Sequence, residues 1–275
     1  MHEFASGSKR NYYGKGDVIV YRLNRDGSPP PVFGATVTML LYGDAFWPTY
    51  TTGDNTNLVA TDSMKNFIQR ETMNFKGRGL ERYCRFLAEK FLATYPQTEG
   101  IQVRAEEIPY EGEVVFSPAR PERAAAQIEI TAAGMVEVRS GIRGFKLLRL
   151  GGSAFHGFVR DQYTTLPDIH NRPLHMWLDL EWLYTRPEAA FETDGLTARV
   201  RETVLAVFRA FESGSIQQVI YQIGTTLLAE IPEMAEVRLE ANNRTWDTVA
   251  ERGETLGVYT DARPPYGILG LTLRR

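Results

Sequence analysis

The sequence has little that binds metals or cofactors. It contains one cysteine, Cys84, and four histidines. A single cysteine excludes an intramolecular disulfide framework, and its helical spacing from Leu80, Tyr83 and Leu87 predicts a buried thiol. The histidines form no cluster with the close spacings of a zinc site. The fingerprints GxGxxG and GxxxxGKS/T are absent as well, so we expect neither a metal nor a bound cofactor.

The chain also lacks a surplus of positive charge and any long apolar run. Its 31 basic and 34 acidic residues give a net charge of −3, whereas nucleic-acid binders usually carry a basic excess. Nowhere do 18 apolar residues run together, and the N-terminal stretch "MHEFASGSKRNYYGKGD" has no apolar core of signal-peptide length. We therefore expect no nucleic-acid partner, no membrane partner and a location in the reducing cytoplasm.

What the sequence does have is a hydrophobic content of 43% over 275 residues, which is ample for a packed core. Its pattern predicts two units with the same order of elements, β-β-α-α-β-β, at residues 1–140 and 141–275. In the first unit we expect a hairpin, a short helix from about Asp62 and a long helix, followed by further strands. The segments are "DVIVYRL", "FGATVTMLLYG", "RGLERYCRFLAEKFLATYP", "IQVRAEEI", "EVVF", "AQIEITA" and "GMVEVRSG".

The second unit repeats this order. We expect strands at "GFKLLRL" and "LHMWLDLEWLY", then two helices, then strands at "AEVRLEA" and "YGILGLTL". In "LHMWLDLEWLY" every second residue from Leu174 to Tyr184 is apolar, which is typical of a strand with one buried face. Apolar residues at helical spacing mark the two helices, and Ser215 is placed to cap the second of them.

These elements predict the α+β class, with an antiparallel sheet that helices cover on one face only. The strands at both edges of such a sheet would remain unpaired. Because exposed edges invite pairing, we expect another copy of the chain to close them into an oligomeric barrel.

The stretch "VATDSMKNF" places Thr61, Asp62 and Ser63 at the start of the short helix. Side chains of these types cap helix N-termini, so we expect a cap at Asp62 or Ser63. The free NH groups of a first helical turn also favour a negatively charged ligand.

Five stretches, taken together, point to a known family: "YYGKGDV", "VATDSMKNF", "SAFHGFVRDQYTTLPDIHNRP", "SIQQVIY" and "NNRTWD". In this order they resemble the cofactor-independent urate oxidase family, in its bacterial branch, and the resemblance extends from Tyr13 to Leu273. A chance match to one stretch is common, but a match to five in order is not. The resemblance implies a tunnel-fold in which two chains form a sixteen-stranded barrel. It further implies that two barrels stack as a homotetramer with active sites between subunits.

The resemblance also implies the reaction and the substrate contacts. Urate, dioxygen and water would give 5-hydroxyisourate and hydrogen peroxide in purine breakdown, without metal or flavin. Arg172 would hold the purine with a paired donor fork, Ile216 and Gln217 would meet its pyrimidine edge, Phe155 would stack on its face, and Asp62 would offer a backbone NH. Each has an ordinary alternative, such as a solvated arginine, an exposed helix glutamine or a core phenylalanine.

For catalysis the resemblance pairs Thr61 with Lys15 from the other subunit as a proton relay, and it places Asn243 at a small polar hole above the ring. One departure stands out. Many members of the family read "NKH" where this chain reads "NRT", so Thr245 takes the place of their relay histidine, with Arg244 beside it. A threonine can pass a proton but cannot store one near neutral pH.

Two other functions remain open at this point. A pterin enzyme of the tunnel-fold typically uses metal-binding histidines and a glutamate anchor, and this chain has Gln217 and no histidine cluster. A purine-binding protein without catalysis would be expected to lose its relay, whereas Lys15 and Thr61 are present.

Overall fold

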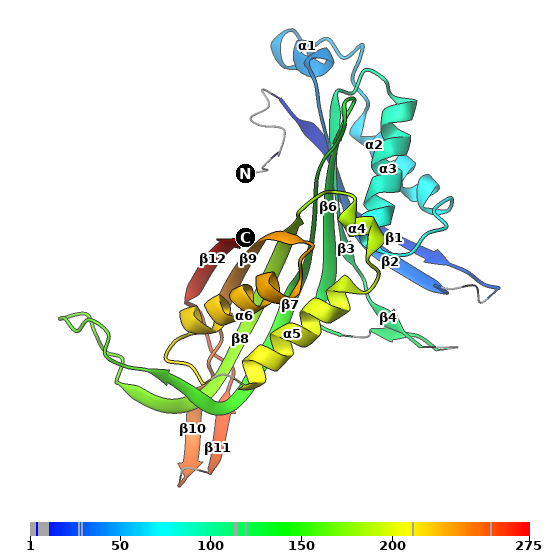
Figure 1. Ribbon diagram of the computed structural model, residues 1–275. Coiled ribbons are helices and arrows are strands. Elements are labelled where there is room, and N and C mark those ends of the chain that lie inside the picture. The colour runs from blue at the N-terminus through cyan, green and yellow to red at the C-terminus, as the bar shows by residue number, and fades with distance from the viewer. Residues whose placement is uncertain are drawn as a thin grey trace. The chain divides into compact units, whose positions relative to one another are not determined.

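The computed structural model describes residues 4, 11–26, 28, 30–112, 115–118, 120–210, 212–253 and 255–275 (Figure 1). The strands are β1 (Tyr13–Leu23), β2 (Val32–Tyr42), β3 (Gly100–Glu107), β4 (Tyr110–Glu111), β5 (Ser117–Pro118), β6 (Arg123–Thr131), β7 (Gly134–Phe155), β8 (Ile169–Tyr184), β9 (Met234–Asn243), β10 (Asp247–Arg252), β11 (Leu256–Thr260) and β12 (Ile268–Arg274). The helices are the 3-10 helix η1 (Asp44–Phe46) and α1 (Trp47–Thr51), α2 (Thr61–Thr72), α3 (Leu80–Thr94), α4 (Ala189–Glu192), α5 (Leu196–Ala210) and α6 (Ile216–Glu230).

The main sheet has eight antiparallel strands in the order β1-β2-β3-β6-β7-β8-β9-β12, so the α+β class is confirmed. The chain forms two compact units: residues 1–141 with 183–194, and residues 142–182 with 195–275. The predicted boundary between residues 140 and 141 lies inside β7, which runs continuously where the sequence predicted two strands.

In the first unit, the predicted hairpin is confirmed as β1 paired with β2 in antiparallel register. The helices α2 and α3 lie along one face of these strands (Figure 1), and α3 packs on β3 and β6. The apolar stripe of α3 is buried as its spacing predicted, and it includes Cys84. Burial raises the pKa of that thiol well above its ordinary value, so Cys84 is a core residue rather than a nucleophile.

The strand β8, which belongs to the second unit up to Trp182, shows the predicted alternation, with Leu174, Met176, Leu178, Leu180, Trp182 and Tyr184 all buried. The helix α6 packs against β9 and β12 and contacts α5. The Ser215 hydroxyl accepts a hydrogen bond from the backbone NH of Gln218 at 3.2 Å, so the predicted cap of α6 is confirmed. Among the described residues, no helix is long and apolar enough to cross a membrane.

Two predictions about local structure were wrong. The segment "EVVF" does not form the predicted strand: Val115 and Phe116 lie outside any strand, and Glu113 and Val114 lie outside the described residues. The predicted cap at Asp62 or Ser63 is absent, because α2 begins at Thr61 and its N-cap is Ala60. The Asp62 carboxylate instead accepts hydrogen bonds from Lys65 and Asn66 of the same helix.

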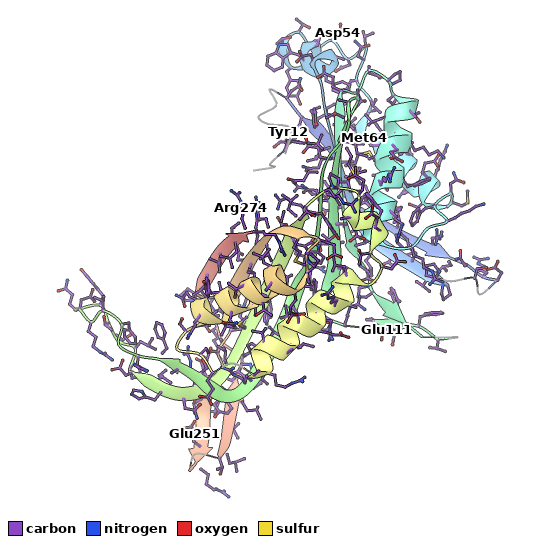
Figure 2. The ribbon with its side chains drawn as sticks, in the orientation of Figure 1. Tyr12, Asp54, Met64, Glu111, Glu251 and Arg274 are labelled. Carbon is purple, nitrogen blue, oxygen red and sulfur yellow. The ribbon has the colours of Figure 1, made fainter. Side chains whose placement is uncertain are left out.

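The sequence pattern also missed the two-stranded hairpin β10–β11, which extends from the second unit and carries Glu251 toward its tip (Figures 1 and 2). Neither strand of the hairpin has a buried face. A pattern of alternating burial could therefore not reveal it.

Candidate active site

A polar cavity of about 630 Å³ in the second unit brings together three of the predicted site residues, Arg172, Asn243 and Thr245. Arg172 belongs to β8, and Asn243 is the last residue of the neighbouring strand β9. The rest of the lining comes from the loop before β8, from β8, from the link between β9 and β10 and from the hairpin β10–β11: Leu166, Ile169, Asn171, Pro173, Trp246, Asp247, Thr248, Glu251 and Tyr259.

Arg172 is half-buried, and its Nε atom is fully buried. Within the described part of the chain this Nε has no hydrogen-bond partner. Burial lowers the pKa of the guanidinium, yet an arginine keeps its charge in proteins at neutral pH. A charged donor fork that is partly desolvated and lacks a protein acceptor suits a planar anionic ligand.

The segment after β9 orients Asn243 through its own backbone. Asn243 Oδ1 accepts hydrogen bonds from the Thr245 backbone NH at 3.0 Å and from the Thr245 hydroxyl at 2.7 Å. This Asx-type turn occupies the oxygen of the amide, and the two donors of the Nδ2 group take no part in it. Asn243 and Thr245 thus form one hydrogen-bonded pair in the lining of the cavity.

Three predicted substrate contacts of the second unit do not line this cavity: Phe155, Ile216 and Gln217. Phe155 stacks on Phe158, with ring centroids 5.0 Å apart and an angle of 15° between the rings. Ile216 is buried and Gln217 is exposed in the first turn of α6. Their contacts with a substrate stay predictions.

Arg244 precedes Thr245, the residue that stands where many family members have a histidine. Its guanidinium lies between two aromatic rings. Its Cζ atom lies 3.3 Å from the ring centroid of Tyr266 and 4.2 Å from that of Trp177. This cation–π arrangement fixes the guanidinium outside the lining of the cavity. Among the arginines named as candidates or their neighbours, Arg172 is thus the one in the lining of the cavity.

The first unit holds the other predicted group, Lys15, Thr61 and Asp62. Thr61 and Asp62 are exposed in the first turn of α2, where the backbone NH groups have no acceptor within the helix. The pKa of the Asp62 carboxyl is lowered mainly by its hydrogen bond and ion pair with Lys65, and further by the charge of Lys15. The helix α2 packs against β1, the strand that carries Lys15, so Lys15 and Thr61 belong to one group within one chain. This differs from the expectation above, which took Lys15 from the other subunit.

Sequence reasoning missed the lining residues from the segment that follows β9, among them Trp246 just before β10 and Tyr259 in β11. Their ring centroids lie 6.3 Å apart, and Trp246 lies 5.2 Å from the ring of His175. Their only sequence signal is the strand-forming residues of "TVAE" and "LGVYT" on either side of the glycine-containing turn "RGET", which can indicate a hairpin without any alternation of burial. The indole Nε1 of Trp246 is buried and has no hydrogen-bond partner among the described residues.

His175 ties β8 to the segment that carries the site. Its backbone carbonyl accepts from Arg244 N at 3.0 Å, and its ring Nδ1 lies 3.2 Å from the Arg244 carbonyl oxygen. Because that oxygen can only accept, Nδ1 carries the proton and Nε2 is the free nitrogen of the neutral ring. Burial lowers the pKa of His175, the Arg244 carbonyl and Asp261 oppose that shift, and the charges of Lys146 and Arg244 add to it.

A pH dependence of stability follows from this histidine. The pKa of His175 in the folded protein lies below its ordinary value, so the unfolded chain binds the proton more readily and stability falls as the pH falls through the folded pKa. We expect the drop in Tm between about pH 7.5 and pH 5.5 to be smaller in His175→Gln than in the unaltered protein. His170→Gln, at an exposed histidine, is the matched control. Equal drops in all three proteins would contradict the assignment.

The potential metal ligands of the described residues are scattered. Among the described residues there is no group of three or more histidine, cysteine, aspartate or glutamate side chains that could hold a metal ion. The rings of His156 and His170 lie 4.6 Å apart, but in the part of the chain that the structure describes no third ligand accompanies them.

Comparison with known proteins supports the resemblance seen in the sequence motifs. The family description "Uricase" matches residues 11–127 and 138–269. The uric acid degradation bifunctional protein PucL of Bacillus subtilis (strain 168) is 36% identical over 96% of this chain. The match spans only 60% of that longer protein. A uricase of Haloferax volcanii is 36% identical, with 87% of this chain and 89% of the relative covered.

Solved structures agree with these relatives over almost the full chain. A crystal structure of urate oxidase from Bacillus sp. TB-90 has a TM-score of 0.88 at 36% identity, covering 96% of this chain and all of that one. A uricase from Bacillus fastidious has a TM-score of 0.87 at 34% identity, covering 98% of this chain and 94% of that one. The motifs, the sheet and these matches together show that the chain belongs to the uricase family.

Proposed function

We propose that the protein is a urate oxidase, which converts urate, dioxygen and water to 5-hydroxyisourate and hydrogen peroxide in purine breakdown. The observation that carries the proposal is the partly desolvated guanidinium of Arg172 in one polar cavity with Asn243 and Thr245. Membership of the uricase family supports it. Urate is planar, anionic and rich in hydrogen-bonding groups, so it matches this set of donors.

The substrate contacts follow from the chemistry of each group. Arg172 donates two charge-assisted hydrogen bonds to an oxygen and a ring nitrogen of urate. The side-chain amide of Gln217 donates and accepts hydrogen bonds at the pyrimidine edge of urate, beside Ile216. The free backbone NH groups of the first turn of α6 favour the bound anion. The ring of Phe155 stacks on the face of the purine, and this contact replaces its present stacking on Phe158.

Catalysis needs protons to be moved while dioxygen is held above the ring. Lys15 and Thr61 form the relay, because an ammonium that is desolvated by a bound ligand loses its proton more readily, and the Thr61 hydroxyl can accept that proton while it passes its own proton on. The Nδ2 group of Asn243 faces the oxygen site, and the Thr245 hydroxyl, bonded to Asn243 Oδ1, passes a proton along a chain of water. The urate dianion itself supplies the electrons, so no cofactor is required.

A second subunit completes the site in this proposal. The first unit supplies the group with Lys15, Thr61 and the backbone NH of Asp62, and the second unit supplies the cavity with Arg172 and Asn243. β1 and β12 are the outermost strands of the sheet, and unpaired edges favour association. We propose two copies per barrel and two barrels per homotetramer, with each first-unit group facing a cavity of a neighbouring subunit.

Oxygen consumption with urate, measured beside a urate binding isotherm, tests the function. We expect both binding and oxygen uptake. Binding without uptake would favour a purine-binding protein without catalysis, and the absence of both would favour a different substrate, such as a pterin.

Activity should survive exhaustive chelation, because the described residues contain no group of three metal-ligating side chains. The measurement is the rate of urate oxidation before and after prolonged dialysis against a strong chelator. Loss of activity that returns only when a metal is added would contradict this part of the proposal.

A further inference from the structure

The pairing of β1 with β2 is interrupted beside Lys15. Lys15 pairs with Met39, and the next paired residue, Val18, lies opposite Val37. Gly16 and Asp17 therefore both lie opposite the single residue Thr38, which is a β-bulge. Asp17 has a φ of 54° and is the one residue other than glycine with positive φ in the described part of the chain.

The bulge changes the face on which Lys15 lies. After it, Val18 and Val20 are buried on the helix-covered face, and Ile19 and Tyr21 are exposed on the other. The strand partner of Lys15 is Met39, which is fully buried, so Lys15 shares the face of Val18 although it is three residues away. In a regular strand, with its period of two, Lys15 would lie with Ile19 on the opposite face.

The register before the bulge is held by Gly14. A Cβ atom added to Gly14 would lie 1.9 Å from the backbone oxygen of Met39, so only glycine fits at this point of the ladder. Sliding β1 by one residue would bring Tyr13 or Lys15 into that position. A shift in the register of β1 therefore cannot compensate for the loss of the bulge without a steric clash at Met39.

The result is that this part of β1 faces the start of α2. The hydroxyl of Tyr13, two residues before Lys15, accepts a hydrogen bond from the backbone NH of Val59 at 3.0 Å. Val59 lies two residues before Thr61, the first residue of α2. Lys15 follows Tyr13 on the same face, and its charge acts on Asp62.

We propose that the Gly16–Asp17 bulge is the device that places Lys15 at Thr61, and that Asp17 is the positioning residue that maintains it. The proposal rests on the function proposed above. Aspartate tolerates the left-handed conformation because its short polar side chain can bond locally, whereas a β-branched residue is strained there. The side chain of Asp17 is exposed, so its replacement changes the backbone preference more than any packing.

Three variants test this inference. Asp17→Gly keeps the left-handed conformation accessible and should retain kcat within about twofold, because glycine adopts positive φ freely. Asp17→Val should lower kcat at least about tenfold with KM for urate nearly unchanged, because a misplaced relay slows proton transfer rather than binding. Ile19→Val introduces valine at an exposed neighbour in ordinary strand conformation and should behave as the unaltered protein.

A double-mutant cycle separates a positioning role from a general structural one. In a Lys15→Met background, Asp17→Val should cause no further loss of kcat, because two changes that act through one group are not additive. An equal fractional loss in both backgrounds, or full activity of Asp17→Val, would overturn the inference. If the unaltered protein oxidises no urate, the proposed function fails instead, and the two failures are thus distinguishable.

Discussion

Lys15→Met should lower kcat for urate oxidation by about 10²- to 10⁴-fold, the usual contribution of a positioned proton-transfer group, while urate affinity changes little. The reason is that Lys15 and Thr61 move protons and are not assigned to hold the purine. Thr61→Ala should act in the same direction. Single-turnover kinetics together with a urate binding isotherm measure the two effects separately.

Lys65→Met is the matched control for this prediction. Lys65 also carries a charge beside Asp62, with its Nζ 2.5 Å from the carboxylate, but lies one helical turn further along α2. Its loss should leave kcat within about threefold, since a partly exposed ion pair contributes little. Unchanged turnover in Lys15→Met would remove the relay from the mechanism.

Arg172→Ala should weaken urate binding more than any other substitution at the substrate contacts. Two charge-assisted hydrogen bonds are lost, each worth about 1.5 to 3 kcal/mol. The dissociation constant should therefore rise by about 10²- to 10⁴-fold. Gln217→Ala should cost less, because a neutral hydrogen bond contributes about 0.5 to 1.5 kcal/mol.

A competitive azapurine inhibitor that shares the same edge but is not oxidised separates binding from chemistry. Its affinity should fall in parallel with that of urate in both variants. Arg209→Ala, which removes an exposed charge from α5, should leave both affinities unchanged. An inhibitor affinity untouched in Arg172→Ala, with urate oxidation abolished, would assign Arg172 to the catalytic step or to the fold.

The regular helices and strands of the fold could be predicted because their buried side chains recur at the spacing of a helix or a strand. The alternation from Leu174 to Tyr184 and the stripe of α3 each face a core, so the sequence carries the pattern. The hairpin β10–β11 has no buried face and leaves no such pattern. The continuity of β7 was also missed: the sequence predicted separate strands at "GMVEVRSG" and "GFKLLRL", whereas one strand continues through both segments.

The candidate site could be predicted in part, for a related reason. Arg172, Asn243 and Thr245 lie in one cavity because β8 and β9 are neighbours in the sheet. The cap expected at Asp62 did not form, since that carboxylate bonds Lys65 and Asn66 instead. The bulge before Val18 was invisible, because a register depends on the partner strand as much as on the strand itself.

The most direct test of urate oxidation is to add urate to metal-free protein and to follow the ultraviolet absorbance of urate together with hydrogen peroxide. We expect the absorbance of urate to fall as turnover proceeds and one molecule of hydrogen peroxide to appear for each urate consumed. Absorbance that stays constant while urate binds, or urate loss without peroxide, would contradict it.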